Sequence, residues 1–191
     1  MAITTLLWQF YGVFLISGLV LTISMLQLRI FPSLRTYFAL QPSEPRIAAF
    51  VGNGFVHADF EHLLNNLRSF MPMALIIIYL FGNVALFSVV IISLLMASAG
   101  IIICSDKNTM HLGFSGACFG CTGFFLADFI RCLMFSERIP VHIIIDIVII
   151  YWYLQFYKRL LARTSLNGRR LSVEGHLFGF MGGVTSLLVM Q

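Results

Sequence analysis

Ser115 and His176 are the two residues whose types and surroundings predict covalent chemistry. Ser115 lies in the segment HLGFSGACFG, among glycines and an alanine, where a polar loop meets a long apolar stretch. His176 lies in EGHLFGFMGG, near the start of the last apolar stretch. A serine hydroxyl is a weak nucleophile until a base removes its proton, and histidine accepts protons near neutral pH. Each residue alone is more often structural, but the two at matching depths predict a nucleophile and its general base.

A second polar group opens another apolar stretch, in the segment HADFEHLLNN with His57, His62 and Asn66. His62 and Asn66 are four residues apart, so on a helix they project from one face. Donors placed in this way stabilise the oxyanion that forms when a serine attacks a carbonyl. The backbone N–H of Ser115, at a helix N-terminus, would add another donor. The alternative is that His62 and Asn66 only hydrogen-bond between helices.

Composition predicts the elements that position these residues. The chain has 191 residues, of which 59% are hydrophobic and 10% charged, and its mean hydropathy is +0.93. Soluble domains are about 45–50% apolar and about 25% charged, so the composition excludes one. Because roughly 20 apolar residues span a bilayer, we expect an all-α polytopic membrane protein with six transmembrane helices, in one domain over residues 1–191. The apolar runs cover about Leu6–Leu28, Phe60–Phe81, Val84–Cys104, Phe114–Phe135, Ile139–Tyr157 and Gly175–Met190.

Small residues form a stripe on the fourth and on the sixth predicted helix. The two stripes consist of Gly116, Gly120, Gly123 and Ala127, and of Gly179 and Gly183. Steps of three or four residues keep each stripe on one helical face. Such stripes let membrane helices approach until their backbones touch. If the two stripes meet, Ser115 and His176 become neighbours.

Other polar and sulfur-bearing residues lie within the apolar runs. Cys118 and Cys121 have zinc-like spacing, but no second pair completes a set of four ligands, so we expect packing cysteines, no metal and no cofactor. Asp128 and Arg131 are three residues apart and are expected to pair. The long first connection, residues 29–59, mixes prolines with apolar residues. We expect it to lie in the membrane interface, and a flexible spacer is the alternative.

On these motifs the sequence resembles the rhomboid family of intramembrane serine proteases, in its minimal six-helix form. The resemblance covers nearly the whole chain. It rests on three motifs in the same order along the chain: His62 with Asn66, then Gly113-Phe114-Ser115-Gly116, then His176 with Gly179 and Gly183.

The resemblance implies a Ser–His dyad without a carboxylate, in which Ser115 is the nucleophile and His176 the general base. It implies an oxyanion hole formed by His62, Asn66 and the Ser115 amide. It also implies that the partner is a transmembrane segment of a membrane-protein substrate within the lipid bilayer, with no nucleic acid. Residues that it implies to be structural near the site are His57, Gly113, Gly116, Phe119, Gly179 and Gly183.

The sequence departs from the family pattern in three places. One is the end of the second predicted helix, where IIIYLFGN replaces a common acidic-basic cluster. Ala48-Ala49 stands near the position of a Trp-Arg pair in the first loop, and Phe119 stands where a tyrosine is common. Phe119 can still stack under His176 but cannot donate a hydrogen bond.

Orientation is predicted differently by charge and by resemblance. The positive-inside rule places the Ser115 end of the helices in the cytoplasm. The resemblance implies the opposite, and an integral multi-pass protein of the bacterial cytoplasmic (inner) membrane.

Two other functions are compatible with parts of the sequence. A catalytically silent relative would bind transmembrane helices, and the loss of Ser115 or His176 would indicate it; both are present. A small transporter would use Arg68, Asp128 and Asp146 as an ion relay. Inverted repeats would support a transporter, and the sequence has no evident ones.

Overall fold

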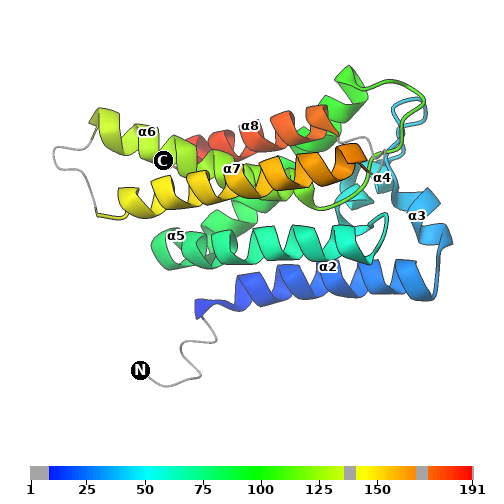
Figure 1. Ribbon diagram of the computed structural model, residues 1–191, viewed down its shortest axis with the longest axis horizontal. Coiled ribbons are helices and arrows are strands. Elements are labelled where there is room, and N and C mark those ends of the chain that lie inside the picture. The colour runs from blue at the N-terminus through cyan, green and yellow to red at the C-terminus, as the bar shows by residue number, and fades with distance from the viewer. Residues whose placement is uncertain (1–8, 136–140, 167–171, 191) are drawn as a thin grey trace.

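The computed structural model describes residues 9–135, 141–166 and 172–190 (Figure 1), and these are helical with no strand. The helices are α2 (Tyr11–Arg29), α3 (Ser33–Phe38), α4 (Ile47–Gly52), the 3₁₀ turn η1 (Asn53–Phe55), α5 (Phe60–Cys104), α6 (Ser115–Phe135), α7 (Ile143–Leu166) and α8 (Val173–Val189). The long helices run roughly alongside one another, and α3 and α4 lie at one end of the bundle. The predicted all-α bundle is confirmed.

Gly82 divides α5 into two membrane passes. A continuous helix of 45 residues would be about 68 Å long, more than twice the thickness of a bilayer core. Gly82 instead adopts φ 84° and ψ 175°, a conformation that side chains disfavour. The Asn83 side chain accepts from Gly12 N at 3.0 Å and donates to Gln9 O at 2.8 Å, which ties the break to the start of α2. The boundary predicted between the second and third helices is therefore confirmed.

α6 and α8 cross where the glycine stripes meet, as predicted. A Cβ added to Gly179 would lie 2.9 Å from the Gly116 Cα, and one added to Gly183 would overlap the Gly120 carbonyl. Only hydrogen atoms at these positions allow the two backbones to touch. Because Ser115 precedes Gly116 and His176 precedes Gly179, this crossing positions both.

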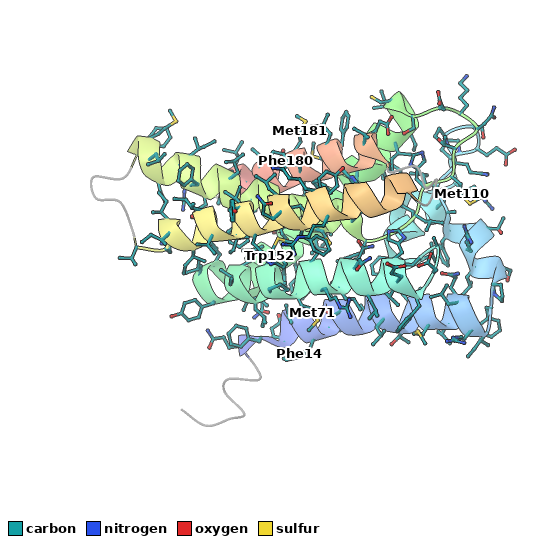
Figure 2. The ribbon with its side chains drawn as sticks, viewed as in Figure 1. Phe14, Met71, Met110, Trp152, Phe180 and Met181 are labelled. Atoms are coloured by element: carbon teal, nitrogen blue, oxygen red, sulfur yellow. The ribbon has the colours of Figure 1, made fainter. Side chains whose placement is uncertain are left out.

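The bundle exposes apolar side chains around its outside. Figure 2 draws Phe14 on α2, Trp152 on α7 and Met181 on α8, which are 55%, 40% and 48% exposed. Among the described residues, α2, α5 and α6 are long and apolar enough to cross a membrane, and α8 is a shorter apolar helix. A surface of this kind fits lipid rather than water, and the chain is an integral membrane protein.

Two predicted boundaries differ from the structure. α7 continues to Leu166 rather than ending near Tyr157, because hydropathy detects only the apolar part of a helix while Lys and Arg extend it readily. α8 begins at Val173, two residues early, because the Ser172 hydroxyl caps it by accepting from Gly175 N at 3.3 Å. The predicted starts at Leu6 and Ile139 lie outside the described residues.

The connection of residues 29–59 packs against the end of the bundle. Arg46 donates to the Thr36 carbonyl at 2.9 Å, which joins α4 to α3. Asn53 donates to the Ser98 hydroxyl at 2.8 Å, and Leu40 exchanges backbone hydrogen bonds with His111. These contacts exclude a flexible spacer and place α3 and α4 beside the loop that leads to Ser115.

Candidate active site

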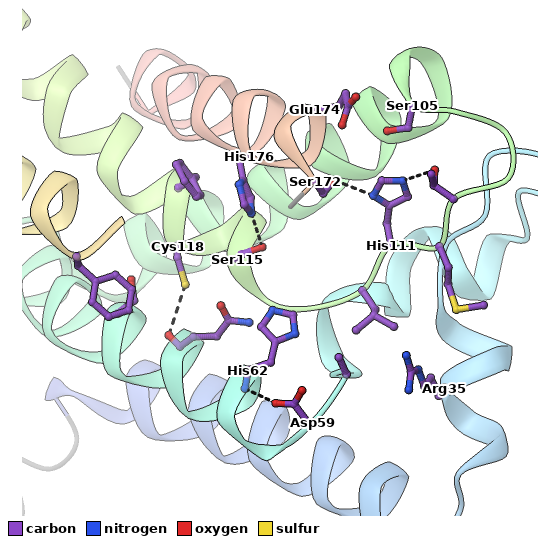
Figure 3. A pocket seen from close by; sticks show the side chains of 18 of the residues that line it. Arg35, Asp59, His62, Ser105, His111, Ser115, Cys118, Ser172, Glu174 and His176 are labelled. Carbon is purple, nitrogen blue, oxygen red and sulfur yellow. Dashed lines mark hydrogen bonds between the residues drawn. The ribbon is translucent and has the colours of Figure 1, made fainter. Parts of the chain in front are cut away.

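The Ser115 hydroxyl and the His176 imidazole meet at the end of the bundle near α3 and α4. Ser115 is the first residue of α6, and His176 lies in the first turn of α8. Ser115 Oγ is 3.0 Å from His176 Nε2 (Figure 3). Nε2 therefore lies within reach of the hydroxyl proton, which is the first requirement for a general base.

Aromatic side chains fix the His176 ring. Phe119 stacks on it with 4.3 Å between ring centroids and 16° between planes, which confirms the stacking predicted for this position. The Tyr157 hydroxyl of α7 is 3.4 Å from His176 Nδ1. When Nδ1 carries the proton it donates to this hydroxyl, and Nε2 is left as the acceptor that faces Ser115. The contact with Tyr157 was not predicted, because an aromatic residue in an apolar run has no distinctive pattern.

Asn66 is held in place by His57. His57 is fully buried, and burial, followed by the nearby charge of His62, lowers its pKa to about 3. The neutral ring donates from Nδ1 to the Ser24 hydroxyl at 2.8 Å, since Ser24 itself donates to the Phe55 carbonyl at 2.9 Å. His57 Nε2 then accepts from Asn66 Nδ2 at 2.9 Å. One N–H of the Asn66 amide is used in this bond, and the other is available to the site.

Gly113 lies against both predicted oxyanion donors. A Cβ at Gly113 would lie 2.8 Å from His62 Nε2 and 3.4 Å from Asn66 Nδ2. Its φ of 113° also disfavours any side chain. His62 sits in the first turn of α5, where its backbone N–H donates to the Asp59 cap at 2.9 Å. The glycine therefore leaves a small space between the Ser115 loop and these two side chains.

One cavity joins the predicted site residues. It has a volume of about 720 Å³ and is lined by Ser115, His176, His62 and Asn66, together with residues of α3, α7 and the loop before α6. Figure 3 shows Ser115, His176 and His62 pointing into this region from α6, α8 and α5. Hydrolysis needs water at the nucleophile, and a cavity of this size at the end of the bundle can hold it.

His111 is a site residue that sequence reasoning missed. Its Nδ1 lies 2.8 Å from the hydroxyl of Ser172, the cap of α8, and its Nε2 lies 2.8 Å from the Thr109 hydroxyl. Burial lowers the pKa of His111. Its position at the start of HLGFSGACFG was the available signal, but a loop histidine has no fixed partner in sequence.

The predicted packing cysteines are buried in α6 with free thiols. The Cys118 thiol donates to the Asn66 carbonyl at 3.5 Å, so it links α6 to α5 beside the site. Cys121 lies in the same hydrophobic core.

Fold and site together define a polytopic membrane protein in which a serine and a histidine share one cavity. A family model described as the Rhomboid domain matches residues 45–191. The chain belongs to the rhomboid family, whose members are mostly intramembrane serine proteases that act on transmembrane substrates. A comparison with curated proteins gives no match.

Proposed function

We propose that this protein is an intramembrane serine endopeptidase that cleaves transmembrane segments of other membrane proteins. The observation that carries the proposal is the 3.0 Å contact between Ser115 Oγ and His176 Nε2 inside a cavity. Membership of the rhomboid family supports the same reaction.

Acylation begins when His176 Nε2 takes the proton of Ser115 as Oγ attacks the peptide carbonyl. The carbonyl oxygen becomes an oxyanion that accepts hydrogen bonds from His62, the free N–H of Asn66 and the Ser115 amide. His176 then gives its proton to the leaving nitrogen, the C–N bond breaks and the acyl group stays on Ser115. A water molecule, deprotonated by His176, releases the acyl group and restores the hydroxyl.

The substrate must present an extended peptide bond to this site. In a transmembrane helix each carbonyl is hydrogen-bonded within the helix and shielded by side chains. Ser115 and His176 lie in the first turns of their helices, so cleavage near the end of a substrate helix, at helix-weakening residues, fits the depth of the dyad.

A fluorophosphonate probe tests the proposal, because it reacts only with an activated serine. The purified protein should be labelled at Ser115, and Ser115→Ala and His176→Ala should not be labelled. Ser17→Ala is the matched control, since its buried hydroxyl has no hydrogen-bond partner in the described residues. Absence of labelling in a folded wild-type protein would contradict an activated nucleophile and favour a silent helix-binding relative.

A further inference from the structure

A second group of polar side chains is buried at the opposite end of α6 from Ser115. Asp128 and Cys132 are four residues apart near the end of α6, and His142, the residue just before α7, is four residues from Asp146 in the first turn of α7. The two helices pack against each other there and run in opposite directions (Figure 1). Each pair lies on one helical face. Asp128 is 13 residues beyond Ser115, or about 20 Å along the helix.

Three of these side chains bring different ligand atoms together. Asp128 Oδ2 is 3.1 Å from His142 Nε2. Cys132 Sγ is 3.7 Å from the same nitrogen and 4.0 Å from the same oxygen. Around tetrahedral zinc, oxygen and nitrogen ligands are about 3.3 Å apart, and sulfur is about 3.5 Å from either. The observed triangle is within about half an ångström of this geometry.

Asp146 is the independent sign that a cation belongs here. Its side chain is fully buried, and neither carboxylate oxygen has a hydrogen-bond partner in the described residues. It lies close enough to Asp128, His142 and Arg131 to interact with them electrostatically. Burying a carboxylate without a hydrogen-bond partner is strongly unfavourable, and a metal ion would supply the missing positive charge.

We propose that Asp128, Cys132 and His142 bind a divalent transition metal ion of the zinc class, with the buried carboxylate of Asp146 as a further negative charge beside them. A donor set of thiolate, imidazole and carboxylate favours zinc over magnesium or calcium, which take oxygen ligands. Binding displaces the thiol proton of Cys132 to water, so the metal–sulfur bond replaces the S–H bond.

Charge balance in the buried cluster supports this assignment. Two carboxylates and one thiolate carry three negative charges, which the metal ion and the Arg131 guanidinium neutralise. Arg131 pairs with Oδ1 of Asp128 and leaves Oδ2 facing His142. Arg131 thereby orients the ligand from outside the metal, as second-sphere groups commonly do. The side chains of Arg131 and His142 are 38% and 27% exposed, which gives an ion a route in.

The competing explanation is a hydrogen-bonded cluster that only joins α6 to α7. It accounts for Asp128, Arg131 and His142, but it leaves the buried Asp146 carboxylate without a hydrogen-bond partner among the described residues. The two explanations differ in whether the full-length protein retains zinc.

Metal binding is measured on full-length protein in detergent, carrying an affinity tag without histidines. Cys104→Ser is the background, because that free thiol is exposed and accessible to metal ions added in solution. After chelator treatment and addition of zinc, we expect about one bound zinc per chain. Cys132→Ser, His142→Ala and Asp146→Asn should each weaken binding at least tenfold, and Cys121→Ser, a buried cysteine of the same helix outside the cluster, should not. With Co²⁺ as the probe, the thiolate-to-cobalt absorption should be lost only in Cys132→Ser.

Two results would overturn the site. One is a folded wild-type protein that retains no zinc after exchange. The other is unchanged zinc affinity in both Cys132→Ser and Asp146→Asn, which would place any bound metal elsewhere. Serine and asparagine match the original side chains in size, and thermal unfolding of each variant shows whether it is folded.

Discussion

At the scale of single residues, the His57 ring controls the geometry of the proposed oxyanion hole. It accepts hydrogen bonds from Asn66 Nδ2 at 2.9 Å and from the Phe114 amide at 3.2 Å. Both bonds need the lone pair of Nε2, so they exist only while His57 is neutral. The side chain that could bind the oxyanion and the backbone just before the nucleophile therefore depend on one buried ring.

The pH dependence of stability follows from the lowered pKa of His57. In the unfolded chain His57 binds a proton near pH 6.5, whereas in the folded protein burial lowers its pKa to about 3. Between these values the unfolded state binds more protons, so stability falls as the pH falls. We expect the contribution of His57 to drop by roughly 1.5–2 kcal/mol from pH 6.5 to pH 5. Unfolding of the wild type and of His57→Asn in detergent, at both pH values, measures this contribution. Equal pH dependence of stability in the two proteins would refute the prediction.

Asn66→Ala should lower turnover about 10²-fold while substrate binding changes little. Loss of its buried hydrogen bond to His57 should also lower thermal stability modestly. In the proposed mechanism its second amide N–H binds the oxyanion, which exists only after attack. The neighbouring Asn65→Ala is the control, because Asn65 is not among the residues that line the cavity. A loss of thermal stability with turnover unchanged per folded molecule would mean that Asn66 serves only as a partner of His57.

At the scale of the helices, the contact between α6 and α8 brings together Ser115 and His176, the proposed dyad. Gly179→Leu would drive a side chain into the Gly116 backbone, and we expect it to cost about 3 kcal/mol of stability and to abolish probe labelling at Ser115. Gly18→Leu is the control, since a Cβ at Gly18 meets nothing within 4 Å. Thermal unfolding measures the loss of stability, and probe labelling measures the reactivity of Ser115. A Gly179→Leu protein as stable and as reactive as wild type would contradict the claim that the α6–α8 crossing positions Ser115 and His176.

The features that could be predicted from the sequence are those that require residues at a regular spacing along the chain. Glycine stripes must recur every three or four residues, and the break at Gly82 must fall between two apolar runs, so both were visible. The roles of Tyr157 and His111 could not be predicted, because each contacts a partner that is distant in the sequence and at no characteristic spacing. The pairs Asp128–Cys132 and His142–Asp146 do have a helical spacing, but their meeting depends on how α7 packs on α6.

At the scale of the whole molecule, its orientation in the membrane decides which compartment the cavity faces. Lys107 is exposed in the loop that leads to Ser115. Following the family expectation, Lys107→Cys, in a chain whose native cysteines are replaced, should react with an impermeant thiol reagent in intact cells. Reaction only after lysis would mean that the positive-inside rule holds instead and that the cavity faces the cytoplasm.

The proposed cleavage would need the whole bundle, since lipid would hold the substrate, the cavity would supply water and the crossed helices α6 and α8 hold Ser115 and His176 together. Purified protein in proteoliposomes, with a membrane-anchored reporter carrying helix-weakening residues near one end, tests these requirements together. We expect the wild type to cut the reporter and Ser115→Ala to leave it intact while still folding, because only one hydroxyl is lost. Equal cutting by both proteins, or no cutting of any reporter by the wild type, would contradict the proposed protease.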